Sequence, residues 1–154
     1  MPDRIRAARP DEVSFLSELA FRSKAHWGYS SDFMEACREE LSLDAADLEH
    51  DVVFALESDE VVLGFYALEP ISEVEIELGF LFVEPGEVGR GLGRRLLAHA
   101  CEEARRRGYD RVVIQSDPNA AAFYESCGAR VVGVKASASI ANRSLPLLEI
   151  VLPG

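Results

Sequence analysis

The chain has 154 residues, of which 48% are hydrophobic and 28% are charged, and this length suits one domain with a sizeable core. The net charge is −11, but residues 1–77 carry 6 basic and 19 acidic side chains, whereas residues 78–154 carry 10 basic and 8 acidic ones. This balance argues against a general nucleic-acid binder, which needs a broad basic face, and it allows a local anion site in the second half.

The first fifty residues predict one short strand and two helices. Residues 5–8 form the strand, and Asp11 then caps a helix whose apolar residues recur at helical spacing to about Lys24. Ser30 or Ser31 caps a second helix over residues 32–41. The aromatic segment at residues 26–29 forms the loop between the two helices.

Three strands follow, and the third changes character halfway. Residues 52–56 and 61–68 are rich in β-branched side chains and form a hairpin. Residues 73–78 alternate between glutamate and apolar side chains, as in a half-buried strand, whereas residues 80–83 are wholly apolar, as in a strand covered on both faces. Gly79 stands where the pattern shifts, which predicts a β-bulge.

The second half predicts two further helices and three further strands. A long helix begins at the glycine-rich segment 89–93 and ends at Gly108, and a buried strand follows at residues 112–114. A short helix over residues 119–127 precedes strands at residues 130–134 and 147–152. The predicted order is βααβββαβαββ, a mixed α/β arrangement in a single domain over residues 1–154.

The glycine-rich segment has the composition of an anion site. Free backbone N–H groups and the positive end of the helix dipole point to one spot, glycines let the backbone approach a ligand, and Arg90, Arg94 and Arg95 add charge. The spacing Gly-x-Gly-x-Gly fits neither the dinucleotide fingerprint nor the P-loop. The alternative to an anion site is an ordinary turn whose arginines are solvated and bind no ligand.

Two motifs together resemble the GNAT superfamily of N-acyltransferases. Residues 83–93, Val-Glu-Pro-Gly-Glu-Val-Gly-Arg-Gly-Leu-Gly, are similar to the acyl-CoA pyrophosphate loop of that family. Residues 119–128, Asn-Ala-Ala-Ala-Phe-Tyr-Glu-Ser-Cys-Gly, resemble its second signature. The resemblance covers most of the chain and implies a mixed, mostly antiparallel central sheet flanked by helices. Val88 departs from the pattern, because the family usually has Gln or Arg there.

The resemblance implies acetyl-CoA as the co-substrate and an N-acetyltransferase activity by direct attack of an amine on the thioester. The pantetheine arm is expected where the strand over residues 73–83 splays from the strand over residues 112–114. The residues expected to hold the cofactor are Phe82, Val83, Val88, Gly89, Arg90, Gly91, Leu92, Gly93, Arg94 and Asn119.

Two residues are expected to carry the chemistry. Tyr124 occupies the position from which the family protonates the leaving thiolate, and a phenol with a pKa near ~10 is a donor at neutral pH. Glu77 is the candidate base, acting through water, and repulsion from Glu73 and Glu75 favours a raised pKa. Packing is the alternative for Tyr124, and a solvated acidic stripe is the alternative for Glu77.

The acceptor site is less specified by the sequence. Trp27 and Tyr29 are expected either to line it or to plug the core, and Arg143 either meets an acceptor carboxylate or faces water. His26 is a weaker candidate for the base or for an acceptor contact. The acidic first half favours a cationic amine, either a small molecule or a protein group. A homodimer is a further expectation, with the strand over residues 147–152 at the interface or in the core.

Other patterns narrow the class of protein. The apolar runs are shorter than the ~18 residues that span a bilayer, and no signal peptide is expected, which favours a cytoplasmic protein. The cysteines and histidines lack the spacing of a disulfide framework or a metal site, so no metal is expected. The alternatives to an enzyme are a non-catalytic acyl-CoA-binding module of the same fold and, disfavoured by the glycine spacing, a nucleotide-binding protein.

Overall fold

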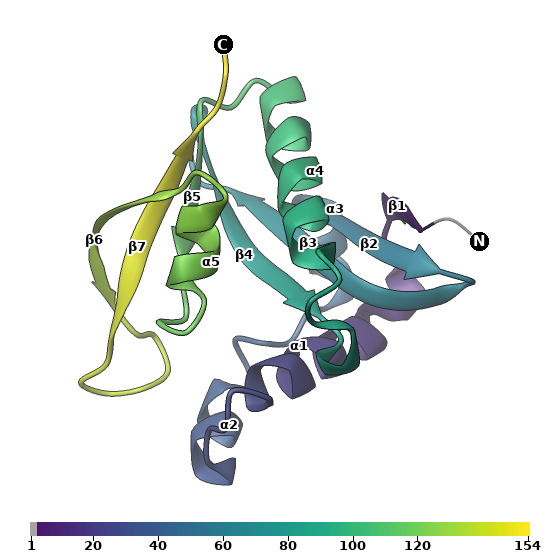
Figure 1. The fold of residues 1–154 in the computed structure, drawn as a ribbon, viewed down its shortest axis with the longest axis vertical. Coiled ribbons are helices and arrows are strands. Elements are labelled where there is room, and N and C mark those ends of the chain that lie inside the picture. Colours follow the sequence, from purple (N-terminus) through teal and green to yellow (C-terminus); the bar gives the residue numbers. More distant parts are fainter. Residues whose placement is uncertain (1–2) are drawn as a thin grey trace.

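A computed structural model describes residues 3–154, which contain a seven-stranded sheet in the order β1-β2-β3-β4-β5-β7-β6 (Figure 1). Neighbouring strands are antiparallel except for β4 and β5, which are parallel. The predicted mixed and mostly antiparallel sheet is therefore confirmed. The strands are β1 (Arg4–Ala7), β2 (Val52–Ser58), β3 (Val61–Pro70), β4 (Glu75–Val83), β5 (Arg111–Gln115), β6 (Arg130–Ala136) and β7 (Ser144–Val151).

The helices follow the predicted order with one addition. They are α1 (Val13–Ala25), α2 (Ser31–Cys37), α3 (Ala45–His50), α4 (Leu92–Arg106) and α5 (Ala121–Ser126), with 3-10 turns at Pro10–Glu12 and Pro85–Glu87. The prediction lacked α3. This helix begins at a reciprocal cap, in which the side chains of Asp44 and Asp47 each accept a hydrogen bond from the backbone N–H of the other. Helix α2 ends at Cys37 and not at Leu41.

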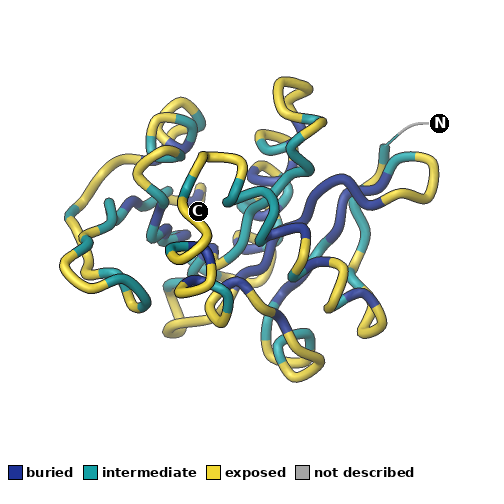
Figure 2. Tube along the Cα trace, turned by 90° about the horizontal axis from the view of Figure 1, so that it is seen from below, coloured by how far each residue is buried: buried dark blue, intermediate teal, exposed yellow. Residues whose placement is uncertain are grey.

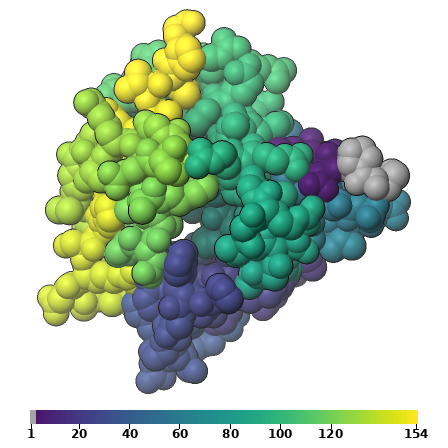
Figure 3. All heavy atoms as spheres, in the orientation of Figure 1, coloured from purple at the N-terminus to yellow at the C-terminus, as the bar shows by residue number. Residues whose placement is uncertain are grey.

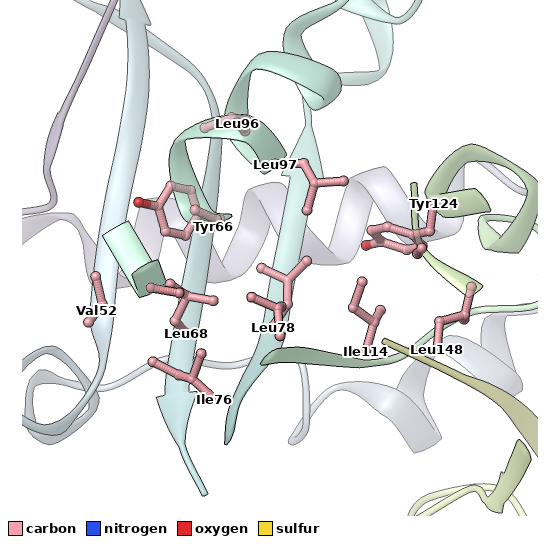
Figure 4. Close-up of a cluster of buried hydrophobic side chains, with 14 of the residues drawn as sticks. Val52, Tyr66, Leu68, Ile76, Leu78, Leu96, Leu97, Ile114, Tyr124 and Leu148 are labelled. Carbon is pink, nitrogen blue, oxygen red and sulfur yellow. The ribbon is translucent and has the colours of Figure 1, made fainter. Parts of the chain in front are cut away.

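The sheet separates two clusters of buried side chains. Helix α4 packs its buried leucines against alternate residues of β3, such as Tyr66 and Leu68 (Figure 4). Helices α1 and α2 pack on the opposite face, against Phe65 and Ala67 of the same strand. Buried stretches run through the inner strands, whereas turns and loops are exposed (Figure 2). None of the helices within residues 3–154 is long and apolar enough to cross a membrane.

A β-bulge in β4 lies at Gly79, as predicted. Leu78 pairs with Leu68 and Phe80 pairs with Ala67, so Gly79 has no partner on β3. Because one extra residue reverses the alternation of side chains, Phe80 then packs with the α1 cluster, whereas Leu81 packs with the α4 cluster. The wholly apolar run after the glycine therefore contacts a core on each face.

Strands β4 and β5 stay together for only three residue pairs. Glu75 to Glu77 pair with Arg111 to Val113, and beyond them β4 continues to Val83 beside β3 alone. The C-terminal parts of the two strands therefore separate at one edge of the sheet. This separation leaves the β5 side of β4 without a partner strand, so backbone groups along that edge are available to a ligand.

Candidate active site

A cavity of about 720 Å³ lies where β4 and β5 separate. In the space-filling view the surface is hollowed where the teal atoms before α4, the green atoms around α5 and the blue atoms of the α1–α2 region meet (Figure 3). The walls come from segments that are distant in the sequence. They include Lys24, Trp27, Glu40, Glu69, Glu77, Phe82, Val83, Val88, Gly89, Gly91, Leu92, Gly93, Arg94, Asp117, Asn119, Ala138, Leu145 and Tyr124.

One end of the cavity is formed by the glycine-rich segment and the start of α4. Gly89 and Gly91 have φ of +98° and +77°, a left-handed conformation that glycine adopts without strain. The backbone N–H groups of residues 89 and 91–94 donate to no other group within residues 3–154. Five free amides at the positive end of a 15-residue helix form a site for an anion such as a phosphate.

The packing of this segment brings α4 and α5 close together. A Cβ atom added to Gly93 would lie 3.3 Å from Cζ of Phe123, so glycine allows this approach. On the other side, the Arg22 guanidinium of α1 donates to the carboxylate of Glu84 through Nε at 2.9 Å, which braces the loop after β4. The anion site is therefore held from both sides.

The three arginines of the segment differ in their surroundings. Arg90 pairs with Glu87 at 2.6 Å, and Arg95 pairs with Asp3 at 2.8 Å. Arg94 donates to the hydroxyl of Ser126 and is the member of the three that lines the cavity. Acidic neighbours thus offset much of the local basic charge, and backbone amides provide most of the attraction for an anion at this end.

Tyr124 reaches the middle of the cavity from α5. Its side chain is only 7% exposed, and the ring lies in the buried cluster on the α4 face (Figure 4). Its hydroxyl makes no hydrogen bond within residues 3–154, and the residue lines the cavity. Burial, with smaller contributions from Cys127 and Asp117, raises the pKa of the phenol well above its usual value. The hydroxyl therefore stays protonated and can donate to a ligand.

Glu77 is the member of the predicted glutamate stripe that lines the cavity. Its carboxylate is half-buried and makes no hydrogen bond or ion pair within residues 3–154, whereas Glu75 pairs with Arg111 at 3.6 Å and Glu73 lies exposed before β4. Burial raises the pKa of Glu77, the charge of Lys135 opposes this, and Glu69 adds to it. An unpaired carboxylate with a raised pKa is suited to accept a proton.

The predicted acceptor residues do not form one contact surface. Trp27 lines the cavity with 53% of its surface exposed, whereas His26 ends α1 outside the cavity wall. The hydroxyl of Tyr29 accepts a hydrogen bond from Nη2 of Arg143 at 2.9 Å, and both side chains lie against Asp117. These two predicted ligand contacts are thus satisfied by the protein itself.

Several wall residues were missed by sequence reasoning. Glu40, Glu69, Ala138 and Leu145 come from four separate segments, and no local pattern connects them. Asp117 could have been identified from the sequence, since it is an acidic residue just after the buried strand over residues 112–114. Asn119 was predicted and lines the cavity, and its backbone N–H donates to Asp117 at 2.8 Å.

Comparison with known sequences decides the family. The family model described as "Acetyltransferase (GNAT) family" matches residues 18–129, which include both the glycine-rich segment and α5. The chain belongs to this acetyltransferase family. A relative named 5-NmdU N-acetyltransferase, from Pseudomonas phage PaMx11, is 29% identical over 130 residues, which cover 84% of this chain and 88% of that protein.

Solved structures of acetyltransferases share the fold of this chain. The PaiA N-acetyltransferase of Thermoplasma acidophilum, in complex with coenzyme A, superposes with a TM-score of 0.79 at 20% identity, covering 98% of this chain and 99% of that one. A GNAT family acetyltransferase of Elizabethkingia anophelis, with acetyl-CoA bound, has a TM-score of 0.70 at 16% identity, covering 97% and 98%. Within residues 3–154 no group of three or more potential metal ligands could hold a metal ion.

Proposed function

We propose that this GNAT family member transfers the acetyl group of acetyl-CoA to a primary amine. The observation that carries the proposal is one cavity, which joins the free amides before α4 to the Tyr124 hydroxyl and the Glu77 carboxylate, neither of which has a partner within residues 3–154. An anion site alone would suit many ligands. Its connection to one proton donor and one proton acceptor matches the needs of acyl transfer from a thioester to an amine.

The residues at the α4 end fit the phosphates of coenzyme A. The free N–H groups of residues 89 and 91–94 would receive the pyrophosphate, with Arg94 beside it. The unpaired edge of β4 at Phe82 and Val83 would hold the pantetheine arm through its backbone groups. Val88 is 69% exposed and lines the cavity with an uncharged side chain. Because the free N–H groups belong to residues 89 and 91–94, valine in place of the family's usual Gln or Arg leaves the proposed phosphate-binding amides unchanged.

The chemistry requires one bond to form and one to break. The amine nitrogen attacks the acetyl carbonyl carbon, a C–N bond forms, and the C–S bond breaks with its electron pair on sulfur. Glu77 accepts, through water, the proton that the ammonium must lose before attack, and Tyr124 gives a proton to the departing thiolate. The nitrogen loses a second proton after the C–N bond has formed, and this proton passes through water back to Tyr124, so the products are the amide and the free thiol. Each proton transfer of this kind contributes roughly 10²- to 10⁴-fold to the rate.

The wall opposite the anion site favours a cationic acceptor. Carboxylates of Glu40, Glu69 and Glu77 line it, whereas its lysine, Lys24, is paired with Asp117 at 3.2 Å. An ammonium group would be attracted to this wall before it is deprotonated for attack.

The test is an acetylation assay with an amine panel of diamines, amino acids, aminoglycosides, aminomethyl nucleosides and lysine peptides. Thiol release from acetyl-CoA is followed, and binding is measured separately by the thermal shift that acetyl-CoA produces. The proposal expects a thermal shift and turnover of at least one cationic amine. A thermal shift with no turnover of any amine would instead favour a non-catalytic acyl-CoA binder, and a shift with ATP or NAD but none with acetyl-CoA would overturn the assignment of the cavity.

A further inference from the structure

A network of nearly buried polar groups surrounds Asp117, directly after β5. Its side chain is 12% exposed, and its carboxylate accepts hydrogen bonds from the Tyr29 hydroxyl at 2.8 Å, the Lys24 ammonium at 3.2 Å and the backbone N–H of Asn119 at 2.8 Å. The guanidinium of Arg143 lies 3.6 Å away and is 17% exposed. One carboxylate therefore accepts three hydrogen bonds and pairs with one further cation, and these four groups come from three parts of the chain.

The hydroxyl of Tyr29 is fully used inside this network. A phenol has one proton to donate and two lone pairs to accept with. Tyr29 donates to Asp117 and accepts from Nδ2 of Asn119 and Nη2 of Arg143, each at 2.9 Å. Its ring stacks on Phe33 with the centroids 4.2 Å apart. The hydroxyl has no capacity left for a substrate, so its role is internal to the protein.

The three connected segments all contribute to the cavity wall. Lys24 and Trp27 come from the end of α1 and the turn after it, Asn119 comes from the turn before α5, Ala138 comes from the β6–β7 loop that carries Arg143, and Leu145 comes from the start of β7. The α1–α2 segment and the β6–β7 loop lie in different parts of the sequence, and hydrogen bonds through Tyr29 and Asp117 join both to the end of β5. The glycine-rich segment before α4 contributes none of these contacts.

We propose that Asp117 is a positioning residue for the acceptor half of the cavity. It ties the α1–α2 segment and the β6–β7 loop to the end of β5. This inference rests on the proposed acetyl transfer for its kinetic readout.

Electrostatics support an ionised carboxylate at this position. Burial alone would raise the pKa of Asp117, but the hydrogen bonds from Asn119 and Tyr29 and the charge of Lys24 hold it below its usual value. Removing the charge while keeping the shape would leave Lys24 and Arg143 without their shared counter-ion. Two nearly buried cations without an anion repel each other, so the segments that carry them would separate.

The experiment compares Asp117→Asn and Tyr29→Phe with a matched control, Tyr109→Phe. Tyr109 lies outside the cavity wall, and its hydroxyl has no partner within residues 3–154. Tyr29→Phe keeps the ring on Phe33 and removes only the hydroxyl, so it serves if Asp117→Asn fails to fold. The readouts are the KM for the amine, kcat, the Kd for acetyl-CoA, and backbone amide hydrogen exchange.

The proposal expects the KM for the amine to rise about tenfold in Tyr29→Phe, because the three hydrogen bonds of this hydroxyl that hold the acceptor half together are lost, with kcat and the Kd for acetyl-CoA within about threefold. Exchange should accelerate at Gly28 and Ser137, whose amides hydrogen-bond within the tied segments, and not in the middle of α4. Tyr109→Phe should match the unmodified protein in every readout.

Two results would overturn the proposal. One is unchanged exchange at Gly28 and Ser137 in both variants, since the segments would then not depend on the network. The other is a fall in kcat or in acetyl-CoA affinity with the KM for the amine unchanged, because the network would then act on the cofactor half. If the unmodified protein acetylates no amine, the proposed function fails, and the exchange measurement alone still decides whether Asp117 ties the segments.

Discussion

Replacing Tyr124 with phenylalanine separates catalysis from packing more cleanly than any other change in this cavity. The ring lies in the buried cluster on the α4 face, and phenylalanine preserves that packing. The hydroxyl makes no hydrogen bond within residues 3–154, so its removal breaks no internal hydrogen bond. The free energy of unfolding should therefore change by less than about 1 kcal/mol.

The expected loss of rate follows from the role of the hydroxyl. General acid catalysis contributes roughly 10²- to 10⁴-fold, and a thiolate, whose conjugate acid has a pKa near ~8.5, needs less help than an alkoxide. We expect kcat to fall about 100-fold, which corresponds to about 2.7 kcal/mol of transition-state stabilisation. Because the pKa of Tyr124 is raised, the unmodified enzyme should lose no activity through ionisation of this group as the pH approaches 10.

The assay is steady-state thiol release at saturating acetyl-CoA, with Tyr109→Phe as the matched control. The Kd for acetyl-CoA, measured by calorimetry, should stay within about twofold, because the phenol makes no hydrogen bond with the segment before α4 that is proposed to bind the phosphates. A kcat within threefold of the unmodified enzyme would remove Tyr124 from the mechanism. A loss of stability of several kcal/mol would contradict the structural argument.

Three further predictions address the anion site, the base and the core. Gly91→Ala forces a residue with a side chain into a left-handed conformation, at a cost of about 1–2 kcal/mol, so the Kd for acetyl-CoA should rise about tenfold. The control is Gly86→Ala, at a position with open space and ordinary φ, which should leave this Kd unchanged. Glu77→Gln should abolish the acidic limb of the pH profile of kcat/KM, which in the unmodified enzyme should report the raised pKa of this buried carboxyl group. If the limb persists in the variant, another group is the base. The same raised pKa means that the folded state binds the proton more tightly than the unfolded state, so stability decreases as the pH rises through it, and Glu77→Gln should raise the Tm at neutral pH. Leu96→Ala, at a fully buried position, should cost about 3 kcal/mol and lower the Tm by roughly 6–12 °C, and a change below 1 kcal/mol would refute the assigned core.

Much of the fold was accessible from local sequence patterns. Alternating glutamates followed by an apolar run predicted both β4 and its bulge, because side-chain alternation and glycine conformation are properties of the strand itself. The helix from Leu92 to Arg106 was predicted by its leucine and alanine stripe. Helix α3 was missed since six residues are too few for a periodic pattern, and only its reciprocal aspartate cap marks it.

The two halves of the candidate site also differ in how far the sequence predicts them. The anion-binding half is contiguous in the sequence, so its glycines could be identified there. The acceptor half is assembled by tertiary contacts, and Glu40, Glu69 and Leu145 carry no shared motif. Tyr29 and Arg143 were predicted as ligand contacts because aromatic and basic loop residues are typical of binding sites. The structure instead places them against Asp117, a nearly buried aspartate that is far from both in the sequence.

The central claim is that the cavity transfers acetyl groups from acetyl-CoA to an amine. The most direct test is quantitative mass spectrometry of both products in one reaction with a cationic amine. The account predicts that free coenzyme A and the N-acetylated amine appear in equal amounts, and that Tyr124→Phe slows both together. Coenzyme A released without acetylated amine, or equal rates with and without the protein, would contradict it.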